Sequence, residues 1–133
     1  MALQYSTAVR NARLDVVEST IGTSAVLKIR SGSAPANCGT ADSGTVLATC
    51  TLPSDWMAAA SSGSKAKSGT WQDTSADATG TAAHFRIYDS GGTVCGLQGT
   101  VGVGSGDLQV DSVSFTAGQS FSITGFTITD GNA

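Results

Sequence analysis

Hydrophobic positions follow a helical period near the start of the chain. Between residues 6 and 21 they recur at three- and four-residue spacing, at Val9, Ala12, Val16 and Thr20. Ser6 or Thr7 can cap the start of a helix, and Gly22 stands where helices commonly end. We therefore predict one helix over residues 6–21. Its other side carries polar residues, namely Arg10, Asn11, Arg13, Asp15 and Glu18.

From residue 25 onward the period changes to strict alternation, which is typical of half-buried strands. Alternating stretches cover residues 25–30, 46–52, 83–88, 95–103, 108–115 and 121–128. Glycine- and serine-rich turns separate them, and Asp89–Gly92 is placed to close a hairpin. In the last stretch Gly125 shifts the phase as a bulge would. The pattern predicts a mainly β fold: an antiparallel β-sandwich, jelly-roll-like or immunoglobulin-like, with one N-terminal α-helix.

The length of 133 residues is typical of a single domain. We divide it into an N-terminal arm and helix over residues 1–22 and a β-sandwich over residues 23–133. Residues 56–80 are rich in Ala, Ser, Gly and Thr and are predicted to form a long loop with a short helical turn near residues 55–58. Trp56 and Trp71 flank this loop. Their rings either pin the loop to the core or lie exposed as binding surfaces.

Charge is scarce, at 13% of residues against roughly 25% in an ordinary domain. The net charge of −3 and the scattered basic residues argue against nucleic acid as a partner. No apolar run approaches the ~20 residues of a membrane span, and the first residues do not resemble a signal peptide. We expect neither a nucleic-acid nor a membrane partner. A surface with few charges favours extended contact with other proteins.

Candidate chemistry is sparse, so we expect no enzyme activity, no cofactor and no metal. His84 lies on a predicted strand without a nucleophile motif nearby, and we expect a surface or interface histidine. Cys38, Cys50 and Cys95 are an odd number without close spacing, which disfavours a zinc site with His84. We expect free thiols in a reducing cytoplasm, with a Cys38–Cys50 disulfide as the alternative.

Three segments carry a resemblance to a known family: Gln4–Asp15, Ser24–Gly32 and Ala82–Asp89. They resemble small virion proteins of tailed phages. Within that group the chain is similar to the capsid cement, or decoration, proteins, which include a jelly-roll cement protein of a Bordetella-infecting phage. The resemblance implies a β-sandwich that forms homo-oligomers on the outer surface of the capsid and bridges major capsid protein subunits. It brings no catalytic or binding residues to match one by one.

The functional expectation is therefore a structural virion protein, assembled in the host cytoplasm, whose partners are the major capsid protein and further copies of itself. Chain ends dock on something when they are ordered, so the N-terminal segment is the first candidate contact surface. The alternative is that the helix covers one sheet of its own sandwich. The candidate interface residues are Leu3, Tyr5, Val9, Val16, Trp56 and Trp71. Two rivals stay open. One is a tail- or fibre-associated module that binds a receptor or carbohydrate, and the other is a small hydrolase built around His84.

Overall fold

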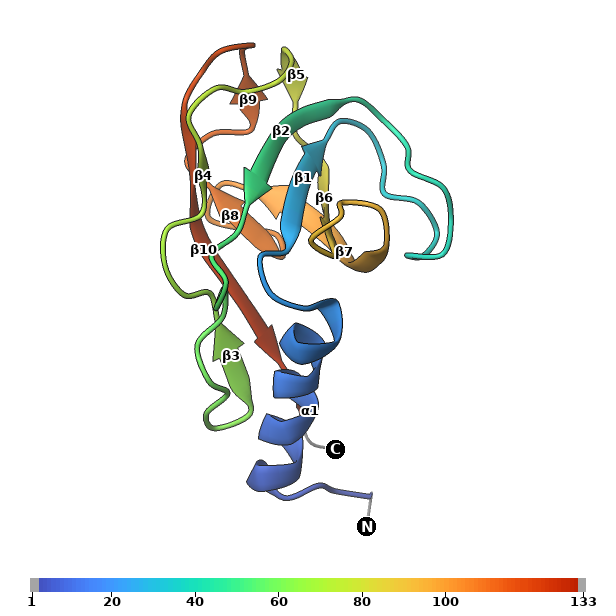
Figure 1. Ribbon diagram of the computed structural model, residues 1–133, viewed down its shortest axis with the longest axis vertical. Coiled ribbons are helices and arrows are strands. Elements are labelled where there is room, and N and C mark those ends of the chain that lie inside the picture. Colours follow the sequence, from blue (N-terminus) through green and yellow to red (C-terminus); the bar gives the residue numbers. More distant parts are fainter. Residues whose placement is uncertain (1–2, 132–133) are drawn as a thin grey trace.

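The computed structural model describes residues 3–131 and places a helix against one end of a curled β-sheet (Figure 1). The ends of the predicted domain, residues 1–2 and 132–133, lie outside the described residues. The mainly β fold with an N-terminal helix is as predicted. The elements are α1 (Thr7–Ile21), β1 (Val26–Arg30), β2 (Val46–Thr51), β3 (Ser64–Ala66), β4 (Gln72–Asp73), β5 (Gly80–Thr81), β6 (His84–Tyr88), β7 (Cys95–Gly102), β8 (Leu108–Val110), β9 (Ser114–Phe115) and β10 (Phe121–Thr129).

Capping groups set both ends of α1 where the sequence predicts them. The Ser6 hydroxyl oxygen accepts a hydrogen bond from the Val9 N–H at 3.2 Å, which satisfies one of the free donors of the first turn. Gly22 ends the helix with φ of 100°, a conformation that favours glycine, and its N–H donates to Glu18 O at 2.9 Å. The helix boundaries predicted from sequence are confirmed.

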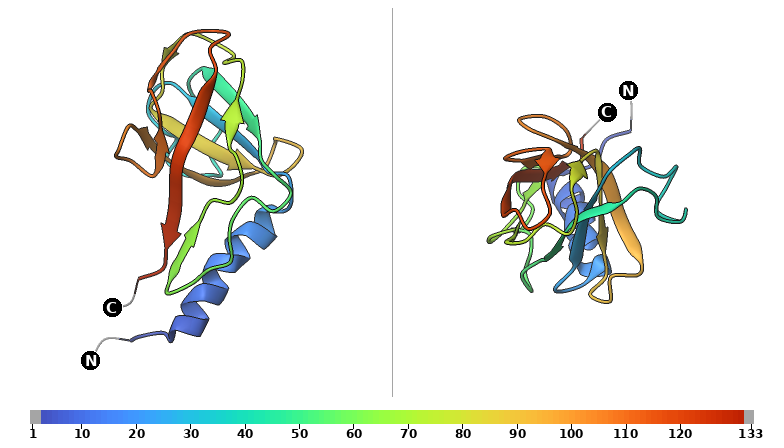
Figure 2. Two further views of the ribbon diagram at one scale, coloured as in Figure 1. Left: turned by 90° about the vertical axis from the view of Figure 1, so that its left-hand side faces the viewer. Right: turned by 90° about the horizontal axis from the view of Figure 1, so that it is seen from above.

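The main sheet has eight strands in the order β2-β1-β6-β7-β8-β10-β3, with β4 also pairing β10. Among the described strands every pair is antiparallel except β7 and β8, which run parallel. The sheet curls around the core (Figure 2), and β2 comes to lie beside the segment around β4. Here Thr49 N–H donates to the Asp73 carboxylate at 3.1 Å and Asp77 N–H donates to Leu47 O at 2.7 Å. Strands β5 and β9 form a second, two-stranded sheet.

Two local predictions for the strands are confirmed. Strands β6 and β7 form a hairpin, and the Asp89 carboxylate accepts hydrogen bonds from the N–H groups of Thr93 and Val94 in its turn. In β10 the register against β8 shifts between Ile123 and Gly125. The shift lets Phe126 be buried, as Ile123 is, although the two residues differ in parity.

Residues 56–80 do not form the predicted loop with a helical turn. They contain β3, β4 and the start of β5, and Met57 forms a bridge with Lys67. The Ala58 N–H donates to Ala66 O, and the Ser68 N–H donates to Trp56 O, both at 2.9 Å. The prediction of a turn was wrong because these backbone groups pair across to distant residues, which small-residue composition does not reveal.

Trp56 and Trp71 are core residues, so their prediction as interface residues was wrong. Both rings are almost completely buried, and their centroids lie 6.0 Å apart. The Trp56 indole N–H donates to Gly22 O at 2.9 Å, and the Trp71 indole N–H donates to Ser68 O at 3.1 Å. Each ring thus buries a large apolar area while its polar group finds a partner. They pin the 56–80 segment to the core, which was the alternative reading of the sequence.

The Trp71→Ala variant should lose about 3–5 kcal/mol of unfolding free energy, because it leaves a large cavity beside Trp56 and Phe126. Urea unfolding followed by circular dichroism measures the change. Val94→Ala is the matched control, since that side chain is exposed and should shift stability by no more than about 0.5 kcal/mol. Equal small effects of both substitutions would contradict the assignment of Trp71 to the core.

Candidate functional site

The helix α1 attaches to the β body through its polar side. Asn11 Oδ1 accepts from the Gly63 N–H at 2.9 Å, Asp15 Oδ1 accepts from the Ala60 N–H at 3.0 Å, and Glu18 Oε1 accepts from the Met57 N–H at 3.1 Å. These backbone donors belong to the segment before β3 and its turn, which lies alongside the helix (Figure 1). The carboxylates and the amide therefore replace water for a stretch of backbone that has few strand partners of its own.

The side chain of Lys65 joins this contact from the β3 side. It is buried, with 3% of its surface exposed, and its ammonium lies 2.8 Å from Asp15 Oδ1 and 2.9 Å from Glu18 Oε2. A third bond runs to Ala58 O at 2.9 Å, so all three ammonium hydrogens have acceptors. Burial acts most strongly on the pKa of Lys65 and lowers it, but the hydrogen bonds to Asp15 and Glu18 raise the pKa above its ordinary value. The ammonium stays charged and holds the two elements together.

The two ends of the described chain are joined by a second polar contact. Arg10 Nη1 donates to Asp130 O at 3.2 Å, and Arg13 Nε lies 3.2 Å from the Asp130 carboxylate. Among the apolar residues of α1, Leu14 is buried, Val17 is half-buried, and Ile21 packs against the core next to Gly96 of β7. The helix is thus held by charges and hydrogen bonds as well as by these apolar residues.

The opposite side of α1 is exposed, and it carries the predicted apolar stripe. We call Val9, Ala12, Val16 and Thr20 the outer helix face; all four are exposed. The exposed fractions of Val9 and Val16 are 43% and 56%. In the arm that precedes the helix Leu3 and Tyr5 are also exposed, and the Arg13 guanidinium lies 4.9 Å from the centre of the Tyr5 ring. Four of the six predicted interface residues therefore lie on the surface in one short segment.

A hollow of about 620 Å³ lies between α1 and the segment before β3. Its lining includes the carboxylates of Asp15, Glu18 and Asp55 and the ammonium of Lys65, so three negative groups meet one positive group. Met57 and Ala59 supply apolar surface. The hollow flanks the polar contact, since Asp15, Glu18 and Lys65 belong to both.

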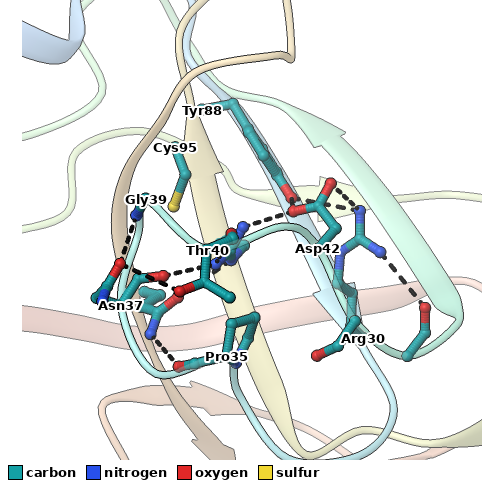
Figure 3. A network of polar contacts seen from close by, with 12 residues as sticks. Arg30, Pro35, Asn37, Gly39, Thr40, Asp42, Tyr88 and Cys95 are labelled. Carbon is teal, nitrogen blue, oxygen red and sulfur yellow. Dashed lines mark hydrogen bonds and ion pairs between the residues drawn. The ribbon is translucent and has the colours of Figure 1, made fainter.

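A second polar network covers one side of β6 (Figure 3). The Asp42 carboxylate, carried by the loop between β1 and β2, accepts from the Tyr88 hydroxyl at 2.6 Å, from Arg86 Nη1 at 2.7 Å and from Arg30 Nη2 at 3.0 Å. The hydrogen bond from Tyr88, followed by the two guanidinium groups, holds the pKa of Asp42 below its ordinary 3.8 against the opposing effect of burial. Burial and this same hydrogen bond raise the pKa of Tyr88.

The prediction that His84 lies on the surface was wrong because the loop that carries Asp42 covers it. The loop between β1 and β2 folds over the side of β6 that alternation assigns to solvent, so His84, Arg86 and Tyr88 are all buried. His84 Nδ1 lies 2.6 Å from Gly32 O, which ties the ring to the start of this loop. The alternating pattern fixes which side chains share a face, but it does not show that a loop covers that face.

Residues 3–131 contain no group of three or more His, Cys, Asp or Glu side chains placed to hold a metal ion. In the same part of the chain no helix combines the length and hydropathy needed to cross a membrane. Cys38, Cys50 and Cys95 are free thiols, and burial raises the pKa of Cys50 to about 12. The thiol of Cys50 is thus protonated and enclosed in the core.

The chain matches no known protein-family model, no curated protein and no solved structure. The resemblance to capsid cement proteins therefore stays an expectation. The sequence did not single out Lys65, which binds α1, or Asp42, which holds the loop between β1 and β2 against β6. Asp15 lies 50 residues from Lys65, and Arg86 lies 44 residues from Asp42, and no local motif signals such pairs.

Stability should fall in acid because Asp15 and Asp42 both have a lowered pKa, Asp15 chiefly through its hydrogen bond from Lys65. A carboxyl whose pKa is lower in the folded state stabilises the fold above its unfolded pKa and loses this contribution as pH falls through the folded pKa. Asp42→Asn should therefore lower the thermal midpoint at pH about 6, and the difference from wild type should shrink below pH about 3. Asp111→Asn, at an exposed aspartate, is the control. A pH-independent difference for Asp42→Asn would contradict the charged role of Asp42.

Proposed function

We propose that this protein is a structural component that decorates and stabilises a phage capsid shell by bridging major capsid protein subunits. The supporting observation is the outer helix face, because Val9, Ala12 and Val16 are exposed there while Asn11, Asp15 and Glu18 bind the β body. An apolar side chain gains free energy when a partner removes it from water. A helix held by polar contacts on one side and apolar on the other is suited to lie between two protein surfaces.

The resemblance of Gln4–Asp15 to cement proteins coincides with this surface, because that segment carries Val9, Ala12 and the exposed arm residue Tyr5. A shell presents many equivalent sites, so a modest contact repeated by every copy sums to a large stabilisation of the particle. We propose that the partners are the major capsid protein and further copies of this chain, on the outer surface of the virion.

The residues that the rival role in carbohydrate or receptor binding needs on the surface are not exposed. It requires Trp56, Trp71 and Tyr88 exposed around a groove, and all three are buried in the structure. The rival hydrolase requires His84 beside a nucleophile in an open cleft. His84 is buried under the loop between β1 and β2, so the proposed role is the non-catalytic one.

The number of copies per particle tests the proposed location. Quantitative mass spectrometry of purified particles of the phage that encodes the chain should find copies on the order of hundreds, as multivalent binding to a shell requires. Immunogold labelling should mark the head surface. A handful of copies at the tail or at one vertex would overturn the proposal.

Two valines with the same exposed fraction of 56% test the surface itself, Val16 on the outer helix face and Val103 after β7. Val16→Glu should weaken co-sedimentation with undecorated shells by about tenfold or more, since it places a charge where an apolar contact is proposed. Val103→Glu should leave binding unchanged. Circular dichroism confirms that both variants fold. Equal binding by the two variants would show that α1 does not contact the shell.

A further inference from the structure

Cys38 lies in the loop between β1 and β2 where Arg86 clamps that loop onto the sheet. Arg86 Nη2 donates to Asn37 O and to Thr40 O, both at 3.0 Å, so Cys38 lies between the two carbonyl groups that one guanidinium nitrogen holds. Gln98 Nε2 fixes the same loop through Pro35 O at 2.7 Å. Hydrogen bonds to residues before and after Cys38 therefore hold it over β6 and β7.

Cys95 begins β7 and pairs with Tyr88 of β6, next to the strand position of Arg86. Its sulfur points toward the loop at Asn37–Thr40 (Figure 3). Partial burial raises the pKa of Cys95 to about 11, and the nearby Cys38 thiol adds to the rise. The Arg86 clamp on Asn37 and Thr40 and the direction of the Cys95 side chain thus make Cys38 and Cys95 neighbours, although the residues lie far apart in the sequence.

The third cysteine differs from this pair in accessibility. Cys38 and Cys95 are both half-buried and reachable from solvent, whereas Cys50 is enclosed in the core. Reagents in solution therefore meet the adjacent thiols and not the isolated one. Cys50 serves as an internal reference for any chemistry at the other two.

We propose that Cys38 and Cys95 form an oxidisable pair whose disulfide fastens the loop between β1 and β2 to the β6–β7 hairpin. The oxidant is a low-molecular-weight disulfide such as oxidised glutathione. One cysteine thiolate attacks it, forms a mixed disulfide and releases one glutathione thiolate. The second cysteine thiolate then displaces the other glutathione. The two protein thiols are oxidised, two molecules of reduced glutathione form, and the two protons pass to the released thiolates or to buffer.

The cross-link changes how the loop that covers His84, Arg86 and Tyr88 is held in place. In the reduced protein this loop is held by hydrogen bonds and by the Asp42 ion pairs, which weaken in acid. A disulfide adds a covalent bond that acid does not break. It also reduces the number of conformations that the unfolded chain can adopt. The inference does not depend on the proposed function, because it concerns only the fold of a single chain.

Incubation of the full chain with oxidised glutathione at mildly alkaline pH tests the pair, since the raised pKa of Cys95 makes exchange slow at neutral pH. Thiols counted in denaturant should fall from three to one, and the intact mass should drop by two hydrogen atoms without added glutathione. The thermal midpoint should rise by about 10 °C and return on reduction.

Peptide mapping identifies the bonded residues. Trypsin leaves Cys38 and Cys50 on one peptide, 31–65, and Cys95 on another, 87–133, because no Lys or Arg follows Arg86. The Cys50→Ala variant removes the ambiguity and should form the same cross-link. Cys38→Ser and Cys95→Ser should each form none, while circular dichroism shows that both fold.

Two outcomes would overturn the proposal. One is a full count of three thiols, or glutathione added to each cysteine singly, after prolonged incubation of the folded protein. The other is a cross-link that persists in Cys38→Ser, which would mean that Cys50 is the partner of Cys95.

Discussion

The position of α1, and with it the character of the exposed surface, depends on one buried cation. The Lys65 ammonium binds Asp15, Glu18 and a backbone carbonyl, and those same carboxylates accept from backbone N–H groups before β3. A charge taken out of water is costly unless every hydrogen has an acceptor, so this arrangement tolerates little displacement. Because Asn11, Asp15 and Glu18 bind the body, the side of the helix that carries Val9, Ala12 and Val16 faces outward. The contact that Lys65 makes with Asp15 and Glu18 therefore determines which side of α1 is exposed.

The same principle recurs on the far side of the sheet. Arg86 is as buried as the core aromatics, yet it binds Asp42, Gln98 and two carbonyls of a loop that lacks regular structure. Arg30, Lys65 and Arg86 account for three of the seven Lys and Arg residues, and all three are interior. These three basic side chains form buried hydrogen bonds and ion pairs that hold loops and the helix against the sheet.

Periodicity predicted the helix boundaries, most strands, the β6–β7 hairpin and the bulge at Gly125, because each of these is encoded by neighbouring residues. It did not predict that Trp56 and Trp71 are core residues, nor that His84 is covered, because coverage is decided by segments far away in the chain. For the candidate surface, the exposure of Leu3, Tyr5, Val9 and Val16 agrees with expectation. The sequence did not predict that polar residues of α1 bind the β body, since a polar helix side and a buried lysine look like surface until their partners are known.

The anchors of α1 also fix when the helix becomes stable during synthesis. A 15-residue helix is marginal on its own in water, and the groups that hold this one lie at residues 57–65 and at Asp130. Because α1 precedes these groups in the chain, it can dock only after residues 57–65 have been synthesised, and Asp130 completes the contact later. During that interval its apolar residues are exposed on a nascent chain, where they are open to chaperones and to neighbouring copies. The segment proposed for contact is thus synthesised before the residues that hold it in place.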